Sequence, residues 1–115
     1  MNDINPLMGD CAMSGFTCLW VDDVRPIPSD CGSEWCSARS AWEALLKLEL
    51  LEFEVVSLDH DLASFVGNKE LNGFDILIWL VQRKLDGLYV PSEIRVHSAN
   101  PVGVRRMKET IARYW

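Results

Sequence analysis

Val56-Ser57-Leu58-Asp59-His60-Asp61 passes from mostly apolar to polar side chains within six residues. A short apolar run of this kind is typical of a buried strand that ends where the polar residues begin. Two other runs share this design: Leu19-Trp20-Val21 leads into Asp22-Asp23, and a run ending near Val96 leads into His97-Ser98. Together they predict a sheet with polar side chains at its carboxyl edge, where open α/β sheets place their ligands.

Helical segments alternate with these strands. Strands are expected over residues 17–22, 54–58 and 93–97, and a short one can also form near residues 35–38. Apolar residues at helical spacing predict helices over residues 40–51 and 73–85 and from Pro101 to about Tyr114. Ser40 and Glu43 predict a capping box at the first helix, and residues 62–72 are expected to form a loop. This alternation indicates an α/β fold with a parallel sheet and right-handed crossovers.

The charge distribution limits the class of ligand. The chain has 115 residues and a net charge of −6. Its first 61 residues hold 12 acidic against 3 basic residues, whereas residues 91–115 hold 5 basic against 2 acidic residues. Binding to long nucleic acids depends on neutralising phosphates, so no such partner is expected. A basic helix in an acidic protein fits a small anionic ligand, although a solvated helix face explains the same charges.

Residues 1–16 have no periodicity and are expected to be a loose lead-in to a single domain over residues 17–115. No apolar run approaches the roughly 20 residues that cross a bilayer, so no membrane partner is expected. The N-terminus lacks the basic and apolar regions of a signal peptide.

We expect a cytoplasmic protein with reduced thiols, the alternative being a structural zinc site. Its four cysteines form no Cys-x-x-Cys pair: Cys11, Cys18, Cys31 and Cys36.

Acidic residues follow two of the predicted strands. Asp22 and Asp23 follow the first, and Asp59 follows another. If these strands are neighbours in a parallel sheet, the three carboxylates meet at one edge, where a divalent cation would relieve their repulsion. Hard oxygen ligands suit Mg²⁺ or Mn²⁺. The alternative is that each aspartate caps a loop, but the clustering of ionisable groups favours a shared site.

The two histidines of the chain, His60 and His97, both lie in polar strand ends. Imidazole moves protons near neutral pH, so two histidines beside a phosphate can divide the roles of general base and general acid. Strand alternation puts Asp59 and Asp61 on one face, with His60 opposite. We expect His60, His97 and Asp61 to be catalytic. The alternatives are hydrogen-bonded structural histidines, or histidine ligands of a softer metal ion.

The segment after the third predicted strand offers an anion site. Asn100 is a good N-cap and Pro101 a good first helical residue. A helix N-terminus presents free backbone N–H groups to a phosphate. We expect Ser98, Asn100 and Arg106 to bind phosphate there. Arg25 is a further candidate, because a guanidinium binds phosphate through two hydrogen bonds, and a salt bridge to the neighbouring aspartates is compatible with that role.

These motifs together resemble the cyclic-phosphate processing receiver domains. The resemblance rests on residues 19–26, 58–61 and 73–76 and on Val96-His97-Ser98-Ala99-Asn100-Pro101-Val102-Gly103 with Arg106-Met107, the Val-His-Ser-Ala-Asn-Pro-Val-Gly run being its most specific part. It extends from about residue 17 to the C-terminus. That family is a branch of the receiver fold of two-component signalling. It is predicted to act on cyclic phosphates, and members occur in prokaryotic and phage genomes, often near conflict systems.

The resemblance implies a three-layer, flavodoxin-like α/β domain, derived from receivers, with a truncated parallel sheet of three to four strands. It puts Asp22 and Asp23 in the metal-binding pair, Asp59 where ordinary receivers are phosphorylated and Ser98 at the switch hydroxyl position. The two histidines are additions to the ordinary receiver pattern. The final strand with its lysine is expected to be missing, so a hydrolytic site is favoured over a phosphorylation switch. The open sheet edge allows a homodimer.

We therefore expect a metal-assisted phosphoesterase that hydrolyses a cyclic phosphate, either a cyclic nucleotide or a cyclic phosphate end. Mg²⁺ or Mn²⁺ on Asp22, Asp23 and Asp59 would stabilise charge on the phosphate oxygens. One histidine would activate water and the other would protonate the leaving oxygen; we assign the latter role to His97, the alternative being that the two roles are exchanged. Two alternatives remain open. A sponge would bind a cyclic nucleotide and release it unchanged, and a degenerate receiver used as an interaction module would tolerate substitution of both histidines.

Overall fold

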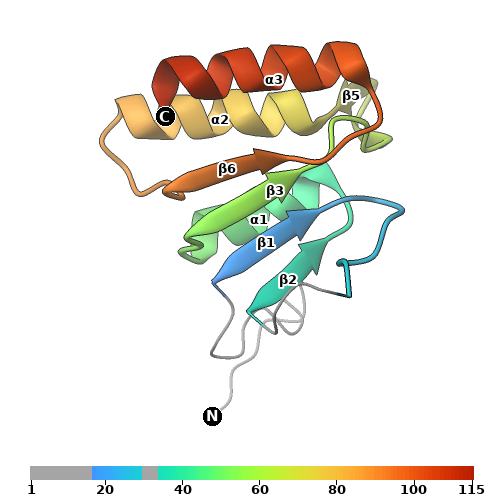
Figure 1. Ribbon diagram of the computed structural model, residues 1–115, viewed down its shortest axis with the longest axis horizontal. Helices are drawn as coiled ribbons and strands as arrows, with labels where there is room; N and C mark the ends of the chain where they lie inside the picture. The colour runs from blue at the N-terminus through green and yellow to red at the C-terminus, as the bar shows by residue number, and fades with distance from the viewer. Residues whose placement is uncertain (1–16, 30–33) are drawn as a thin grey trace.

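The computed structural model describes residues 17–29 and 34–115 of the chain, and Figure 1 gives the arrangement of its elements. Strands and helices alternate much as the sequence predicts. In chain order the elements are β1 (Cys18–Val21), β2 (Trp35–Ala38), α1 (Ala41–Leu50), β3 (Val55–Leu58), β4 (Ser64–Val66), β5 (Lys69–Leu71), α2 (Gly73–Leu85), β6 (Glu93–Val96) and α3 (Pro101–Tyr114). The lead-in expected over residues 1–16 lies outside the described residues.

The main sheet has four strands in the order β2-β1-β3-β6, and every pair is parallel. This confirms the parallel α/β fold and the fourth strand near residues 35–38. All four residues of the central strand β1 are buried, as expected for a strand covered on both faces. The strands all point toward one end of the molecule (Figure 1), so the residues that follow them gather there.

The two faces of the sheet are covered differently. Buried residues of α1, α2 and α3 join one hydrophobic cluster with the sheet residues that include Leu19 and Val21. The opposite face holds a second cluster, centred on Trp20 and Trp35, to which none of the described helices contributes. A second helical layer, which a three-layer arrangement requires, is therefore not present among the described residues.

The segment after β1 explains this difference. In an ordinary alternation a helix would follow β1 and cross the second face. Pro26 and Pro28 lack the backbone N–H that a helix interior needs, and residues 22–29 form no helix. Ile27 of this segment packs against the second cluster in place of a helix.

The loop expected over residues 62–72 is instead a hairpin. β4 and β5 pair antiparallel, with Val66 opposite Lys69, so only Gly67 and Asn68 connect them. Gly67 has a φ of 62°, a left-handed conformation that favours glycine. A glycine in a two-residue connection is typical of a hairpin, and this is the pattern that the loop prediction missed.

The helix starts also differ in detail from the prediction. The Ser40 hydroxyl accepts the N–H of Glu43 at 3.0 Å, as expected, but the Glu43 carboxylate accepts the N–H of Arg39 at 2.8 Å. The reciprocal bond of the predicted capping box is thus shifted by one residue. A complete capping box forms at α2, between Asn72 and Asp75.

Two observations concern the expected compartment. Cys18 is a buried free thiol, whereas Cys36 is disulfide-bonded, so the expectation of reduced thiols is wrong at Cys36. Disulfides are rare in reducing compartments, and the cytoplasmic location stays a prediction. Cys11 and Cys31 lie outside the described residues.

Within the described part of the chain, no helix has the length and apolar character needed to span a membrane.

The start of α2 packs directly on the end of β3, and this contact generates a prediction. The N–H of Gly73 donates to the carbonyl of His60 at 2.8 Å, and a Cβ at Gly73 would lie 1.9 Å from the carbonyl oxygen of Asp59. We expect Gly73→Ala to lower the free energy of unfolding by about 1–3 kcal/mol, measured by urea denaturation, because the backbone must shift.

The control for this variant is Val102→Ala, which truncates an exposed side chain in the first turn of α3. It should change the free energy of unfolding by less than about 0.5 kcal/mol. Equal stability of Gly73→Ala and the unmodified protein would contradict the close contact between α2 and β3.

Candidate functional site

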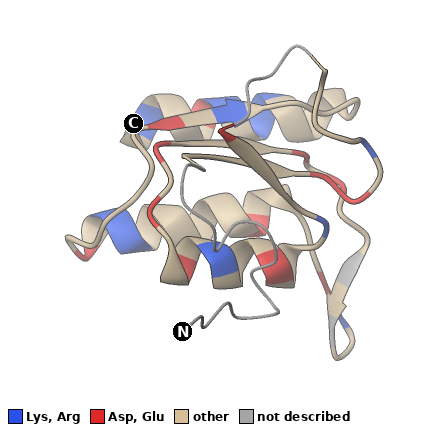
Figure 2. Cartoon of the chain, turned by 90° about the horizontal axis from the view of Figure 1, so that it is seen from below, with Lys and Arg blue, Asp and Glu red and all other residues tan. Residues whose placement is uncertain are grey.

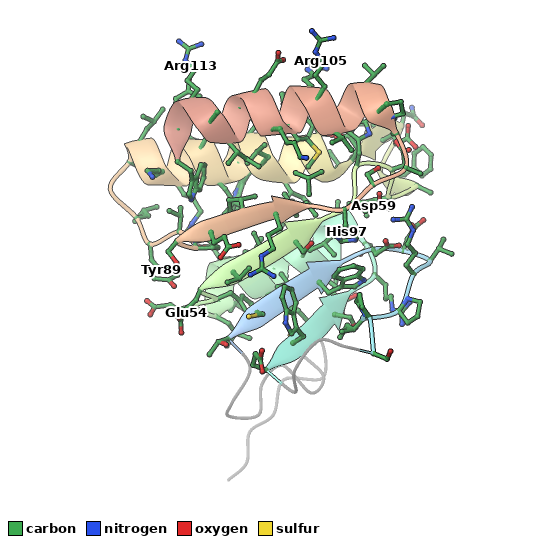
Figure 3. All side chains as sticks on the ribbon, in the orientation of Figure 1. Glu54, Asp59, Tyr89, His97, Arg105 and Arg113 are labelled. Carbon is green, nitrogen blue, oxygen red and sulfur yellow. The ribbon has the colours of Figure 1, made fainter. Side chains whose placement is uncertain are left out.

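The parallel register aligns the polar residues that follow β1, β3 and β6. The last residues of these strands lie level with one another. The hydrogen-bond ladder continues for one more residue, because Asp59 N–H donates to Val21 at 2.9 Å and His97 N–H donates to Leu58 at 3.0 Å. Asp22, Asp59 and His97 therefore lie in one row at the edge of the sheet, and Figure 3 shows Asp59 and His97 close together there.

An open pocket of about 510 Å³ lies at this edge. Half of the residues that line it are acidic and one is basic, so an anionic ligand would need a cation in addition to that one guanidinium. Figure 2 shows where acidic and basic residues lie along the chain. The lining residues are Asp22, Asp23, Val24, Arg25, Asp59, Asp61, Ala63, Glu70, Ser98 and Ala99.

The three aspartates predicted to share a site do lie together. One carboxylate oxygen each from Asp22, Asp23 and Asp59 lies within 4.8 Å of the others. Three oxygen donors at this spacing suit a hard divalent cation such as Mg²⁺ or Mn²⁺. The sequence prediction of three carboxylates at one sheet edge is thus met by the geometry of the described residues.

Asp22 is almost completely buried, with 1% of its surface exposed. Its Oδ1 accepts the backbone N–H groups of Val24 at 2.9 Å and Arg25 at 2.7 Å, and its Oδ2 accepts from His97 at 3.1 Å. Burial by itself raises the pKa of this carboxyl, but these hydrogen bonds outweigh burial and lower it. Asp22 is therefore ionised at neutral pH, and it fixes the loop that carries Arg25.

Asp59 is buried as well, but its pKa is shifted in the opposite direction. Burial is the largest influence and raises the pKa of its carboxyl; a hydrogen bond from Ser98 lowers it, and the charge of Asp22 raises it again. The charges of Arg25 and His97 lower it by less, so the pKa is raised overall. The ionised form of Asp59 is thus disfavoured by its surroundings. A divalent cation would remove this penalty, so the donor set fits such an ion.

His97 lies behind Asp22. Its Nε2 lies 3.1 Å from Oδ2 of Asp22, its Nδ1 lies 2.6 Å from the hydroxyl oxygen of Ser57, and its ring stacks on Trp20 at a centroid distance of 3.6 Å. Burial lowers the pKa of His97 by more than Asp22 and Asp59 raise it. The neutral ring then donates through Nε2–H to Asp22 and accepts the Ser57 hydroxyl at Nδ1. Both ring nitrogens are occupied, and the ring is not part of the pocket lining.

His60 has turned the other way, toward α3. A Cβ at Gly103 would lie 2.4 Å from Cγ of His60, so the imidazole packs against the first turn of this helix. Its Nδ1 lies 2.7 Å from Oδ1 of Asp61, and the amide of Asn100 donates to the same carboxylate at 3.3 and 3.4 Å. The hydrogen bond from His60 is the main cause that lowers the pKa of Asp61. Asp59 and Asp61 line the pocket while His60 does not, as the alternation of strand faces predicts.

The predicted phosphate ligands are only partly brought together. Arg25 and Ser98 line the pocket, and the Nε of Arg25 lies 4.0 Å from Oδ2 of Asp22. Asn100 instead caps α3 by accepting the N–H of Gly103 at 3.0 Å. The structure does not bring Arg106 to the pocket, because its guanidinium lies 4.2 Å above the ring of Phe74 in α2.

Four lining residues were not anticipated: Val24, Ala63, Glu70 and Ala99. Glu70 belongs to the hairpin and Ala63 directly precedes it, in the segment that the sequence predicted to be a loop. The available signal for Glu70 was the Gly67-Asn68 pair, which is typical of a two-residue hairpin connection and would have placed Glu70 in a strand.

Comparison with known protein families agrees with the resemblance. The family model of the cyclic-phosphate processing receiver domain matches residues 17–113, which include all the lining residues of the pocket. No curated protein matches the chain.

The unfavourable setting of Asp59 generates a prediction about stability. Because its pKa is raised, the ionised carboxylate destabilises the metal-free fold at pH values above that pKa, and the penalty disappears as the pH falls through it. We expect Asp59→Asn to raise the melting temperature of chelator-treated protein by a few degrees at pH 7. The advantage should shrink as the pH is lowered.

Calorimetry of both proteins across this pH range is the measurement. Asp86→Asn is the matched control, since Asp86 lies at the exposed C-terminus of α2, far along the chain from the acidic cluster. A lower melting temperature for Asp59→Asn at pH 7 would contradict the view that burial, together with the charge of Asp22, disfavours the ionised form of Asp59.

Proposed function

We propose that this chain, which belongs to the cyclic-phosphate processing receiver domain family, is a metal-dependent phosphoesterase that opens a cyclic phosphate. The observation that carries the proposal is the meeting of Asp22, Asp23 and Asp59 within 4.8 Å, in a pocket that also holds Arg25. Carboxylates beside a guanidinium can hold a cation and a phosphate at the same time.

In this proposal Asp22, Asp23 and Asp59 hold Mg²⁺ or Mn²⁺. Such an ion would supply charge stabilisation at the phosphate oxygens and lower the pKa of a bound water. Asp22 stays ionised through its three hydrogen-bond donors. A cation would also offset the burial and the charge of Asp22, which disfavour the ionised form of Asp59. Asp23 is only partly buried and needs no rearrangement of the core to reach the ion.

The residues of the chain itself bind and orient the substrate. Arg25 donates to the phosphate oxygens, since its side chain is half exposed at the pocket and its loop is fixed by Asp22. Trp20 adds to this support, because its indole N–H donates to the carbonyl of Arg25 at 3.1 Å. The guanidinium is therefore carried on an ordered loop, which favours a defined orientation of the phosphate.

Asp61 is the proposed proton acceptor. It lines the pocket with 66% of its side chain exposed, and His60 and Asn100 hold its carboxylate in place. As water attacks, its oxygen forms a bond to phosphorus and its proton passes to Asp61. One of the two ring P–O bonds breaks, and the leaving oxygen takes a proton from solvent at the open pocket mouth. The product is a phosphomonoester.

The histidines act in this proposal as positioning residues, each behind a pocket carboxylate. His97 holds Asp22 and His60 holds Asp61, in the way that outer hydrogen bonds orient metal ligands and bases. The general acid and base roles expected from the sequence remain untested predictions. They are less favoured because both nitrogens of His97 already have partners within the protein.

One observation favours a second candidate function. Neither imidazole is part of the pocket lining, so the pocket offers carboxylates and a guanidinium but no ring nitrogen to a ligand. A protein that binds a cyclic nucleotide without cleaving it needs no more than this. The two candidates differ in the fate of the ligand.

The experiment is a turnover assay with 2′,3′-cyclic AMP, 3′,5′-cyclic AMP and a cyclic dinucleotide, each with Mg²⁺, with Mn²⁺ and with chelator. We expect metal-dependent conversion of one class to an opened phosphate, read by chromatography. Asp61→Asn should lower turnover by about 10²-fold or more, because it removes the proton acceptor. The matched variant Asp86→Asn should keep full turnover.

Ligands that stay intact under every condition would contradict the phosphoesterase. Tight binding with release of unchanged ligand would then favour the second candidate, a protein that binds a cyclic nucleotide without cleaving it. A protein that neither binds nor cleaves any of these ligands would contradict both candidates for these classes of cyclic phosphate.

The proposed role of His97 has its own test. We expect His97→Ala to weaken metal activation by about 10–100-fold, because Asp22 loses one of its donors, while turnover recovers at saturating Mn²⁺. His97→Gln should restore part of the affinity, since an amide can donate to Asp22. The measurement is turnover as a function of Mn²⁺ concentration. A loss of turnover that no concentration of Mn²⁺ restores would support the general acid role instead.

A further inference from the structure

The β4–β5 hairpin contributes residues to the pocket and also carries an exposed aromatic side chain. Ala63, just before β4, and Glu70 of β5 line the pocket. Phe65, in the middle of β4, is 63% exposed and belongs to neither hydrophobic cluster of the described residues. Figure 1 shows β5 at the end of the molecule toward which the strands of the main sheet point.

The register of the hairpin fixes the side on which Phe65 stands. Phe65 pairs directly with Glu70. Side chains of directly opposed residues in an antiparallel pair lie on the same face, with Cβ atoms about 4.5–5.5 Å apart. Because Glu70 lines the pocket, the phenyl ring rises beside it from the pocket-facing side of the hairpin.

A second observation indicates that this position is suited to a ligand. Val24, which lines the pocket from the loop after β1, is 76% exposed. The pocket therefore has carboxylates at the strand ends and apolar side chains toward solvent. An isolated exposed apolar residue is ordinary, but Phe65, although not itself a lining residue, pairs with Glu70 of a pocket that already has the groups for a phosphate.

The bend that leads into the hairpin is also unusual. Ala63 has a φ of 45°, a conformation that residues other than glycine rarely adopt. Such positions cost free energy and are found mostly where the surrounding structure serves a site. This bend lies between Asp61, the proposed proton acceptor, and Phe65, so it sets the direction of the ring relative to the pocket.

We propose that Phe65 stacks on the base of a nucleotide whose phosphate is held by Arg25 and the acidic cluster. The substrate class is then a cyclic phosphate that carries a nucleobase. Stacking of a base on an aromatic side chain contributes to affinity and involves no net charge. It therefore adds affinity in a pocket whose acidic lining repels an anion. This inference rests on the proposed function of the same pocket.

The test compares adenosine 2′,3′-cyclic phosphate with ribose 2,3-cyclic phosphate, which has the same cyclic phosphate and no base. Phe65→Ala should raise KM for the adenosine compound by about 10-fold, leave kcat near its original value and leave the ribose compound unaffected. Phe65→Trp should retain affinity for the adenosine compound. Val102→Ala, which truncates another exposed apolar side chain outside the pocket lining, should change neither value. Where ligand is bound without cleavage, the dissociation constant replaces KM.

The outcomes separate this inference from the function on which it rests. If the unmodified protein handles both compounds and Phe65→Ala affects both or neither, the stacking role is overturned and the phosphoesterase stands. If the unmodified protein neither binds nor cleaves either compound, the proposed function fails for this class and the inference fails with it. A change in oligomeric state without a change in KM would make Phe65 a contact between copies of the chain and would overturn the stacking role.

Discussion

The site depends on the parallel pairing of β1 with β3, which sets two carboxylates side by side where the strands end. Asp22 and Asp59 follow paired residues of neighbouring strands, and they are only 1% and 6% exposed. A buried carboxylate is unfavourable in its ionised form, and a like charge beside it adds to the cost; the pKa of Asp59 is raised first by burial and then by the charge of Asp22. The hydrophobic cluster between the sheet and its three helices keeps the pairing in place despite that repulsion.

The surrounding residues respond to the two charges in different ways. Asp22 is stabilised from within the protein, by two backbone N–H groups and by His97. Asp59 has a hydroxyl partner in Ser98 and lacks comparable compensation. The asymmetry leaves one carboxylate with a lowered pKa and one with a raised pKa that would gain from a bound cation. Asp61 repeats the first arrangement at the pocket rim, where His60 and Asn100 donate to it.

Much of this arrangement could be predicted from the sequence, because it follows from strand alternation and parallel pairing. The row of aspartates is one such feature, and the boundaries of α2 are another. The orientation of His97 could not be predicted, since it depends on Ser57 and Trp20 of two strands meeting below it. Arg106 was assigned to phosphate because it lies near a helix N-terminus, but the ring of Phe74 lies beneath its guanidinium. On the second face of the sheet the described residues place Ile27 and no helix, a detail that follows from Pro26 and Pro28 after β1 rather than from the alternation of strands and helices.

The central claim is that the acidic cluster is a divalent cation site, and the most direct measurement is a titration that counts the Mn²⁺ bound per chain. Asp23→Asn is the appropriate variant, because Asp23 is less buried than Asp22 and Asp59 and does not hold the loop. The account predicts one Mn²⁺ per chain for the unmodified protein and for Asp86→Asn, with affinity reduced at least about 10-fold in Asp23→Asn. An unmodified protein that binds no Mn²⁺, or an Asp23→Asn variant that binds it equally well, would contradict the account.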